Sequence, residues 1–515
     1  MNKNHKNIFK ENSFPVKNTG LILIITFLII FYFTNNSLSF NLNEQVSTHT
    51  LDNGMEVIMV ERDFSPTIHF NLMFDVGGID EPAGKGGIAH MVEHMAFKGT
   101  PSLGSKDPEK EKNLLEDLEK TAGKYFEAKD NDTAEEKLEE LKEKFEKSQE
   151  KAREQAETNP LQGIFDKHGA QNYNAGTGYD TTYYYLSLPE NKLELYARIQ
   201  ADILKNSVFR YFYKEVDVVK EERRQRNEDD PFGYLQEQYL QKAFQYHHYG
   251  RSLIGNMDEI SNYRMTEARD FWNTYYHPNR AVLVMIGDID PEKDIEIIEK
   301  YFEAVPAGPE EKTAIPPEPI QTSERRTEVT FDAEPQMLIG YHKPTYPEKD
   351  AYIMDIISAL LGKGRTSRLY QRLVREEQVA VDVSTYNNMP GMREDNQFSI
   401  HVKTRHPHTP EEVEEIIYDE IDKLINEPIS EKELEKVFNQ VRGDFIRQLD
   451  SREGLARQLA FYEHFLDGWE NLEKYPDIIN SITPKEIQNT ARYYLQKDNR
   501  TVAILKSENS EGKED

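Results

Sequence analysis

The spacing of apolar residues changes period several times along the chain, and each change predicts a different element. In "THTLDNGMEVIMVERD", residues 48–63, an Asp-Asn-Gly turn separates two alternating stretches, which predicts a β-hairpin. "TIHFNLMFDVGG", residues 67–78, alternates in the same way and predicts a further strand. "GGIAHMVEHMAFKGT", residues 86–100, then changes to helical spacing. We therefore expect paired strands followed by a helix at the start of the folded region.

Residues 105–160 differ from their surroundings because they are dense in Glu and Lys and poor in apolar positions. Apolar stripes at helical spacing occur twice, and "KDNDT", residues 129–133, separates them, which predicts an antiparallel helical hairpin inserted into the domain. Three roles are open: a solvated spacer, a functional lid, or a docking arm on an exported scaffold. The stripes consist of Leu114, Leu115 and Leu118, and of Leu138, Leu141 and Phe145.

The chain repeats itself across a proline-rich segment, residues 305–324, which is typical of a stiff, exposed linker. "YYHPNRAVLVMIGD" (275–288) resembles "YYLQKDNRTVAILKS" (493–507), so that in each half a helix ending in two tyrosines leads into a β-branched strand. We predict an α+β fold of two homologous units, each an antiparallel sheet with packed helices. The predicted ranges are 44–304 for the first unit, 325–507 for the second, and 508–515 for a disordered tail.

The N-terminus has the layout of a secretory signal peptide, residues 1–39. Lysines precede the apolar run "GLILIITFLIIFYF", residues 20–33, and small residues follow it. The run is shorter than the roughly 20 residues that cross a bilayer comfortably. We expect an exported protein, periplasmic or in the cell envelope; the alternative is an uncleaved anchor at residues 20–33, which would be its one membrane contact.

Composition excludes several kinds of chemistry. The net charge of −29 argues against nucleic-acid binding. The absence of cysteine removes thiol nucleophiles and thiolate metal ligands. A metal site in this chain must therefore use imidazole and carboxylate groups.

His90 and His94 lie four residues apart in the predicted helix, so both imidazoles point from one face and can bind one zinc ion. Glu93 lies one turn from His90, where it can take a proton from water activated by the metal and later donate it to a leaving amine. This H-x-x-E-H order is the inverse of the commoner zinc-peptidase motif. The alternative is a pair of partly buried structural histidines.

A catalytic zinc site commonly has three protein ligands and one position for water. The helical pattern of residues 211–231 places Glu215 and Glu222 on one face with Val218 and Val219, where a carboxylate needs a cation. Glu221 points toward the arginines, and we interpret it as a solvated charge. Spacing favours Glu222 as the third ligand and Glu215 as support for a histidine N–H. The alternative is an exposed acidic and basic helix.

These motifs resemble the insulinase/pitrilysin family of inverted-motif zinc peptidases, in the branch that includes mitochondrial processing peptidases and their bacterial relatives. The resemblance spans about residues 48–505. It implies half of a clamshell, one Zn²⁺ per chain, His90, His94 and Glu222 as ligands, Glu93 as catalytic base and Glu215 as the assisting glutamate. The stretches that carry it are "LDNGMEVIMVERD", "HMVEHMAFKGT", "GAQNYNAGTGYDTTYYYLSLP", "EVDVVKEERR" and "YYHPNRAVLVMIGDIDP".

The resemblance also implies a substrate-binding strand. The segment "NYNAGTGYDTTYYY", residues 172–185, matches an exposed edge strand that pairs with extended peptide, with Asn174 and Ala175 nearest the scissile bond. The pattern of residues alone leaves an ordinary core strand open. The implied activity is zinc endopeptidase cleavage of short or unfolded peptides; the alternative is a non-catalytic assembly subunit or scaffold.

The second half departs from the family pattern. Active members or their partners often carry an arginine and, seven residues later, a tyrosine that stabilise the substrate, where this chain has Val374 and Val381. Arg372 or Arg375 is a candidate replacement for the arginine. The resemblance therefore implies a heterodimer with a homologous partner subunit that supplies these groups; a homodimer is the alternative.

Overall fold

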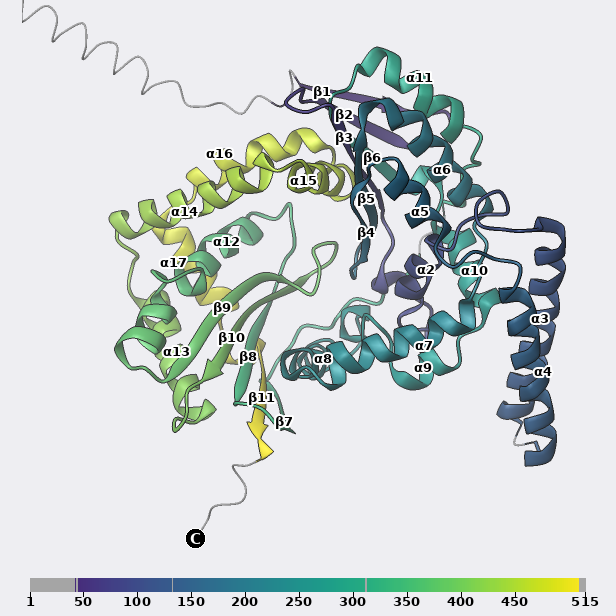
Figure 1. Cartoon of the computed structure of the whole chain (residues 1–515). Helices are drawn as coiled ribbons and strands as arrows, with labels where there is room; N and C mark the ends of the chain where they lie inside the picture. The colour runs from purple at the N-terminus through teal and green to yellow at the C-terminus, as the bar shows by residue number, and fades with distance from the viewer. Residues whose placement is uncertain (1–41, 43–44, 132, 311–312, 509–515) are drawn as a thin grey trace, which may run out of the picture. The chain divides into compact units, whose positions relative to one another are not determined.

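A computed structural model of the chain describes Leu42 and residues 45–131, 133–310 and 313–508 (Figure 1). The expected leader, residues 1–39, and nearly all of the expected tail, residues 508–515, lie outside these ranges. From Gln45 onward the chain forms one compact unit. None of the helices among the described residues is long and apolar enough to cross a lipid bilayer.

The first half builds a six-stranded sheet in the order β1-β2-β6-β3-β5-β4, in which β2 and β6 are parallel and the other neighbours are antiparallel. The expected hairpin joins β1 to β2, and β4 is an edge strand. The strands are β1 (Val46–Thr50), β2 (Glu56–Glu61), β3 (Thr67–Phe74), β4 (Gln171–Thr177), β5 (Thr182–Pro189) and β6 (Ala281–Gly287).

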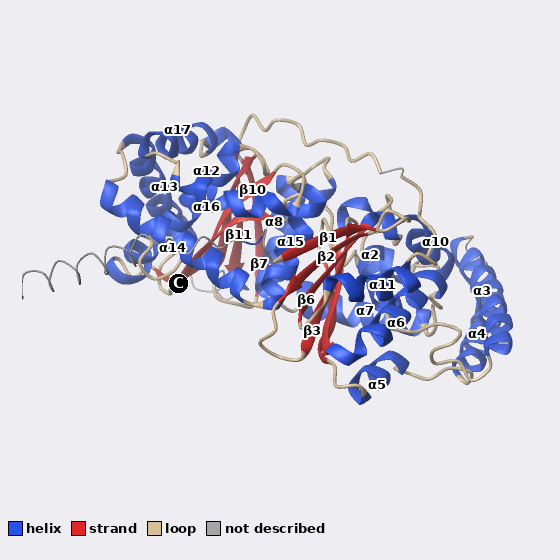
Figure 2. Cartoon of the chain, turned by 90° about the horizontal axis from the view of Figure 1, so that it is seen from above, coloured by secondary structure: helices blue, strands red, loops and turns tan. Residues whose placement is uncertain are grey.

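Several helices of the first half share one core with the apolar faces of β2, β3, β5 and β6. Figure 2 shows the strands in red with helices beside them. A π-helical turn (Arg224–Glu228) follows α7 directly. The helices are α2 (Ile88–Ala96), α3 (Pro108–Asp130), α4 (Glu135–Arg153), α5 (Pro160–Lys167), α6 (Leu193–Asn206), α7 (Phe212–Arg223), α8 (Pro231–Ala243), α9 (Met257–Ser261), α10 (Met265–Tyr275) and α11 (Pro291–Phe302).

The second half repeats the first. Its five-stranded sheet has the order β7-β11-β8-β10-β9, with β11 parallel to β7 and antiparallel to β8, as β6 is parallel to β2 and antiparallel to β3. The predicted pair of α+β units is confirmed. The strands are β7 (Arg325–Phe331), β8 (Gln336–Lys343), β9 (Ala380–Met389), β10 (Asn396–Thr404) and β11 (Arg500–Ser507); the helices are α12 (Lys349–Gly362), α13 (Pro410–Asn426), α14 (Glu431–Asp450), α15 (Arg452–Phe465), α16 (Tyr475–Asn480) and α17 (Pro484–Tyr494).

Each half contributes one helix to the sheet of the other. Helix α8 packs against β7, β8 and β11, and α15 packs against β3 and β6. Tyr239 of α8 lies 3.0 Å from the Ser399 hydroxyl, and Arg452 at the start of α15 donates to the Thr67 hydroxyl at 2.6 Å. These exchanges give the two halves a shared core.

The segment 305–324 has no helix or strand among its described residues and is mostly exposed, as expected for a linker, but it is held by polar contacts at two points. Glu318 accepts hydrogen bonds from the backbone N–H groups of Tyr246 and His247 at 2.9 and 3.1 Å. The Gln321 side chain is 8% exposed and donates to the Arg500 carbonyl. Polar contacts of this kind are hard to foresee from a proline-rich composition.

The charged insert forms the predicted hairpin, with α3 and α4 side by side in Figures 1 and 2. Its inner face is anchored on α7: Phe145 contacts Tyr213 with ring centroids 4.8 Å apart. At its base, Glu111 of α3 forms a buried ion pair with Arg210, whose guanidinium also donates to the carbonyl of Thr100. The insert therefore packs against the helix that carries Glu215 and Glu222, and it is more than a solvated spacer.

Candidate metal site

Helix α2 starts at a point where the backbone requires glycine. Gly87 has φ +84°, and a Cβ there would lie 2.2 Å from the Ile254 carbonyl oxygen. Buried Glu81 accepts the backbone N–H groups of Gly87 and Ala89 at 2.8 and 2.9 Å, and thereby caps the helix. Ile88 and its buried neighbours on α2 face the core. The start of the helix and its core face together set the direction of the motif side chains.

His90 and His94 face one another from successive turns of α2, with their Nε2 atoms 3.3 Å apart. Glu222, on α7, places its Oε2 3.6 Å from both Nε2 atoms. A tetrahedral zinc ion about 2.0–2.1 Å from each ligand requires ligand atoms roughly 3.3–3.4 Å apart. The three side chains thus fit a zinc ion closely, and they form the one such metal-compatible group found among the described residues.

Val218 and Val219, which lie between Glu215 and Glu222, differ in exposure. Val219 is fully buried, as the sequence pattern suggests, whereas Val218 is 44% exposed. The prediction of a shared buried side is therefore wrong for Val218, because the core contacts only the Val219 side of α7. Glu221 is exposed and pairs with Arg224 at 3.0 Å, as expected for a solvated charge.

Glu215 lies behind His94. Its Oε1 is 2.9 Å from His94 Nδ1, and its Oε2 accepts from Lys98 Nζ at 2.7 Å. Burial acts to raise the pKa of Glu215, but the hydrogen bonds from His94 and Lys98 outweigh it and lower the pKa to about 2. An ionised Glu215 accepts the Nδ1–H of His94, which leaves the Nε2 lone pair directed at the metal position.

Glu93 lies beside the three ligand atoms, and its side chain is almost fully buried. Burial raises its pKa, while a hydrogen bond at 2.7 Å from the Thr177 hydroxyl opposes that rise. Burial, together with the nearby His94, lowers the pKa of His90 to about 3, so this ring is neutral at pH 7. A neutral imidazole is the form that binds a metal.

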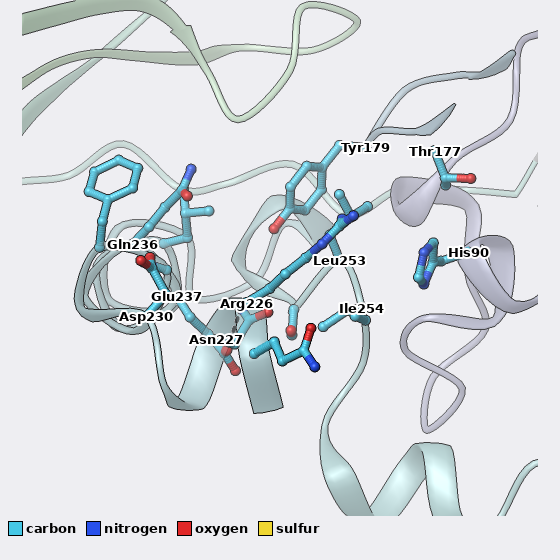
Figure 3. A pocket seen from close by; sticks show the side chains of 15 residues that line it. His90, Thr177, Tyr179, Arg226, Asn227, Asp230, Gln236, Glu237, Leu253 and Ile254 are labelled. Atoms are coloured by element: carbon cyan, nitrogen blue, oxygen red, sulfur yellow. Dashed lines mark hydrogen bonds between the residues drawn. The ribbon is translucent and has the colours of Figure 1, made fainter. Parts of the chain in front are cut away.

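A cavity of about 530 Å³ adjoins these groups (Figure 3). His90 and Thr177 lie at one end of it, and Asp230, Gln236 and Glu237 gather at the other. Phe232, Leu240, Leu253 and Ile254 add apolar walls. The site is thus open to a ligand with both polar and apolar groups.

The residues predicted to bind substrate lie on the edge strand β4. Asn174 is exposed and pairs with Tyr185 of β5, whereas Ala175 packs against the core and pairs with Tyr184. The free side of β4 is available for an added strand. On the same strand, Thr177 reaches Glu93, so the edge leads to the candidate site.

In the second half, Val374 is half-buried and Val381 is 53% exposed on the edge strand β9. Arg372 is bound to Glu377 at 2.8 Å and to Asp419 at 3.2 Å, and it is therefore occupied by other contacts. Arg375 is exposed. Of the two candidate replacements, the structure leaves only Arg375 available.

Sequence reasoning missed two side chains that complete the site, Thr177 and Lys98. A signal existed for both. Thr177 lies two residues after Ala175 in an alternating strand, so it shares that residue's face. Lys98 follows His94 by four residues, one turn further along the same side, just past the end of α2. Their contacts with Glu93 and Glu215 nevertheless depend on segments far away in the sequence.

The fold and the donor set are those of a metallopeptidase class, and comparison with known proteins places the chain within it. The sequence model described as insulinase (peptidase family M16) matches residues 57–150 and 144–257. The model described as the peptidase M16 inactive domain matches residues 264–441. The chain belongs to the insulinase family, peptidase family M16, and the resemblance drawn from the motifs is confirmed.

Relatives and solved structures agree with this assignment. The zinc protease PqqE of Helicobacter pylori is 26% identical over 470 residues, which cover 89% of this chain and 92% of the relative. A crystal structure of a protease from Helicobacter pylori has a TM-score of 0.74 at 26% identity and covers 90% of this chain and 99% of that one. The periplasmic protease PqqL of Escherichia coli shares the fold, with a TM-score of 0.68 at 16% identity; the match covers 90% of this chain and 48% of PqqL.

Proposed function

We propose that this chain is a zinc-dependent endopeptidase that hydrolyses short or unfolded peptides, with one zinc ion per chain. The observation that carries the proposal is the spacing of His90 Nε2, His94 Nε2 and Glu222 Oε2, at 3.3 and 3.6 Å, next to the buried carboxylate of Glu93. Membership of a peptidase family and the zinc-protease names of relatives support it.

Zinc held by these atoms would polarise a peptide carbonyl and lower the pKa of a water molecule. Glu93 accepts the proton of the attacking water and donates it to the amine that leaves. Burial raises the pKa of Glu93, which favours the protonated form that the second step requires. Thr177 holds one Glu93 oxygen, and Glu215 keeps His94 oriented.

Extended peptide is the substrate form that suits the edge of β4. Backbone pairing along this edge gives affinity with little preference for sequence, and folded proteins seldom present a free strand. Asn174 and Ala175 bind the peptide next to the bond that is cut. The downstream side chains of the peptide then enter the cavity beside His90.

The functional assembly in this proposal is a heterodimer with a homologous subunit. Two observations support it: the valines at positions 374 and 381 lack donor groups, and the chain matches only about half of PqqL, which is a longer protease. The partner supplies an arginine and a tyrosine toward the substrate. The alternative is a homodimer. The mass of the native complex distinguishes a homodimer from a heterodimer.

Export is proposed from the leader alone, with the periplasm or cell envelope as the destination. Comparing the mass of the mature N-terminus with that of the full chain distinguishes a cleaved signal peptide from an anchor at residues 20–33. A mature chain that starts near residue 40 supports cleavage, and a retained N-terminus in the membrane fraction supports the anchor.

The test of the activity compares wild-type protein with Glu93→Gln in zinc content and in cleavage of unfolded casein and a quenched fluorogenic peptide library. Glu93→Gln is expected to keep its zinc and lose about 10²–10⁴-fold in kcat, the usual contribution of a general acid–base group. Zinc-loaded wild-type protein that cuts no peptide, alone or with its co-purified partner, contradicts the proposal and favours a non-catalytic assembly role.

A further inference from the structure

One arginine on the π-helical turn after α7 contacts the candidate metal site and has no role in the chemistry above. Arg226 Nη2 lies 2.7 Å from Glu222 Oε1, while the other oxygen, Oε2, faces the two imidazoles. The carboxylate is therefore divided between a guanidinium and the metal position. π-Helical turns are rare and occur frequently at functional sites.

The burial of the two partners differs. The Glu222 side chain is 19% exposed, and the Arg226 side chain is 69% exposed. The guanidinium has five N–H donors, and its contact with a side chain of the described residues is the one from Nη2 to Glu222. An ordinary exposed ion pair contributes little to stability. The contribution of this contact to folding therefore does not explain why residue 226 is an arginine.

The open side of Arg226 faces the cavity beside His90. The residue lines that cavity together with His90 and Thr177, and in Figure 3 its guanidinium end points between Tyr179 and Leu253 toward them. Glu237, at the far end, is already paired with Arg223 at 3.1 Å and with Asn227 at 3.0 Å. Arg226 is thus a cation next to the site, and it borders the cavity.

We propose that Arg226 holds Glu222 in one-oxygen binding to the metal and donates hydrogen bonds to the carbonyl oxygen of the peptide bond being cut, an inference that rests on the proposed peptidase function. Negative charge builds on that oxygen during hydrolysis, and a preorganised cation stabilises it. Arg226 would add a donor from the first half to those that the partner subunit supplies, because Val374 and Val381 provide none and Arg372 is bound to acids.

The experiment compares Arg226→Met and Arg226→Lys with Arg224→Met, in the complex as purified. Arg224 is the matched control, because it lies on the same turn and pairs with exposed Glu221, away from the site. Zinc affinity is measured by chelator competition, and kcat and KM are measured at saturating zinc. Circular dichroism and thermal unfolding establish that each variant is folded.

Arg226→Met is expected to bind zinc about 10-fold more weakly, as for loss of a group that orients a ligand. Per bound zinc, it is expected to lose about 10²-fold in kcat with little change in KM. Arg226→Lys is expected to retain more of kcat than Arg226→Met, because lysine keeps the positive charge but lacks the planar guanidinium group with its paired donors. In a second pair of variants, Arg226→Ala and Arg224→Ala, added guanidinium ion at millimolar concentration partly restores kcat in the first and leaves kcat in the second unchanged.

Two results would overturn the inference. Zinc affinity in Arg226→Met equal to that of Arg224→Met removes the positioning role. An unchanged kcat per bound zinc removes the contact with substrate. Failure of the proposed function looks different, since wild-type protein would then lack zinc or peptide cleavage before any arginine is changed.

Discussion

His94 Nδ1 lies 2.9 Å from Glu215 Oε1, so the residue that binds the metal position with one ring nitrogen is held by a carboxylate at the other. Lys98 binds the second oxygen of Glu215 and keeps it ionised. The chain Lys98–Glu215–His94 sets the imidazole tautomer before any metal arrives. Three elements of the fold, the end of α2, the loop after it and α7, must be in place for this to occur.

Replacing Glu215 by Gln should weaken zinc binding by roughly 10–100-fold and leave the fold intact, because the amide is a poorer acceptor for the Nδ1–H of His94. Chelator competition measures the affinity. Asp217→Asn is the matched control, since Asp217 is exposed on the same helix and pairs with Lys220. Equal zinc affinity in the two variants would show that Glu215 does not orient His94.

Replacing Glu222 by Gln should have a larger effect on zinc than Glu215→Gln, because it removes the charged ligand itself. Zinc per chain after gel filtration is expected to fall from about one to well below one. Glu221→Gln, one residue earlier and exposed, should retain the metal. Full zinc occupancy in Glu222→Gln would mean that another group is the third ligand.

Replacing Glu111 by Gln should destabilise the protein by about 3–5 kcal/mol, because it leaves the Arg210 guanidinium buried without its anionic partner. The side chains of Arg210 and Glu111 are 1% and 3% exposed. Urea unfolding measures the loss. Glu109→Gln, exposed in the first turn of the same helix, is the control and should unfold like wild type.

The far end of the insert should be dispensable, in contrast to its base. Replacing residues 128–143 by a short Gly-Ser linker keeps Phe126 and Phe145, whose rings pack against Tyr213. Peptide cleavage and the unfolding midpoint should then stay close to wild type. Loss of cleavage with normal stability would instead assign the tip to substrate or partner docking.

The buried Lys343 should make the free energy of unfolding increase as the pH rises above neutral. Its side chain is buried, and burial lowers its pKa from 10.5 to about 8. Between about pH 8 and 10.5 the unfolded chain binds a proton that the folded chain does not, so the free energy of unfolding increases with pH. Relative to Lys343→Met, wild type should gain about 2–3 kcal/mol across that window. Urea unfolding of both proteins at pH 7.5, 9 and 10.5 measures this gain. If the free energies of unfolding of wild type and Lys343→Met change with pH in parallel, the lowered pKa of Lys343 is contradicted.

Much of the fold could be predicted because the signals are local. The strand and helix periods, the Asp-Asn-Gly turn and the two apolar stripes of the insert each depend on neighbouring residues, and the elements formed as expected. The anchoring of the insert could not be predicted in this way. Glu111 and Arg210 are far apart in sequence, and nothing local pairs them. The same holds for Glu318, whose hydrogen bonds hold the proline-rich segment.

By itself the sequence determined the pairing of His90 with His94, since residues four apart on a helix share a face whatever surrounds them. It also determined the duplicated architecture, through two matching helix–strand junctions. Only the tertiary structure decided that Glu222 approaches both imidazoles within 3.6 Å, that Thr177 binds Glu93, and that Arg372 is occupied by acids. The physical reason is that helix periodicity is a property of a few adjacent residues, whereas the approach of α7 and β4 to α2 depends on strand order and on packing across the whole core.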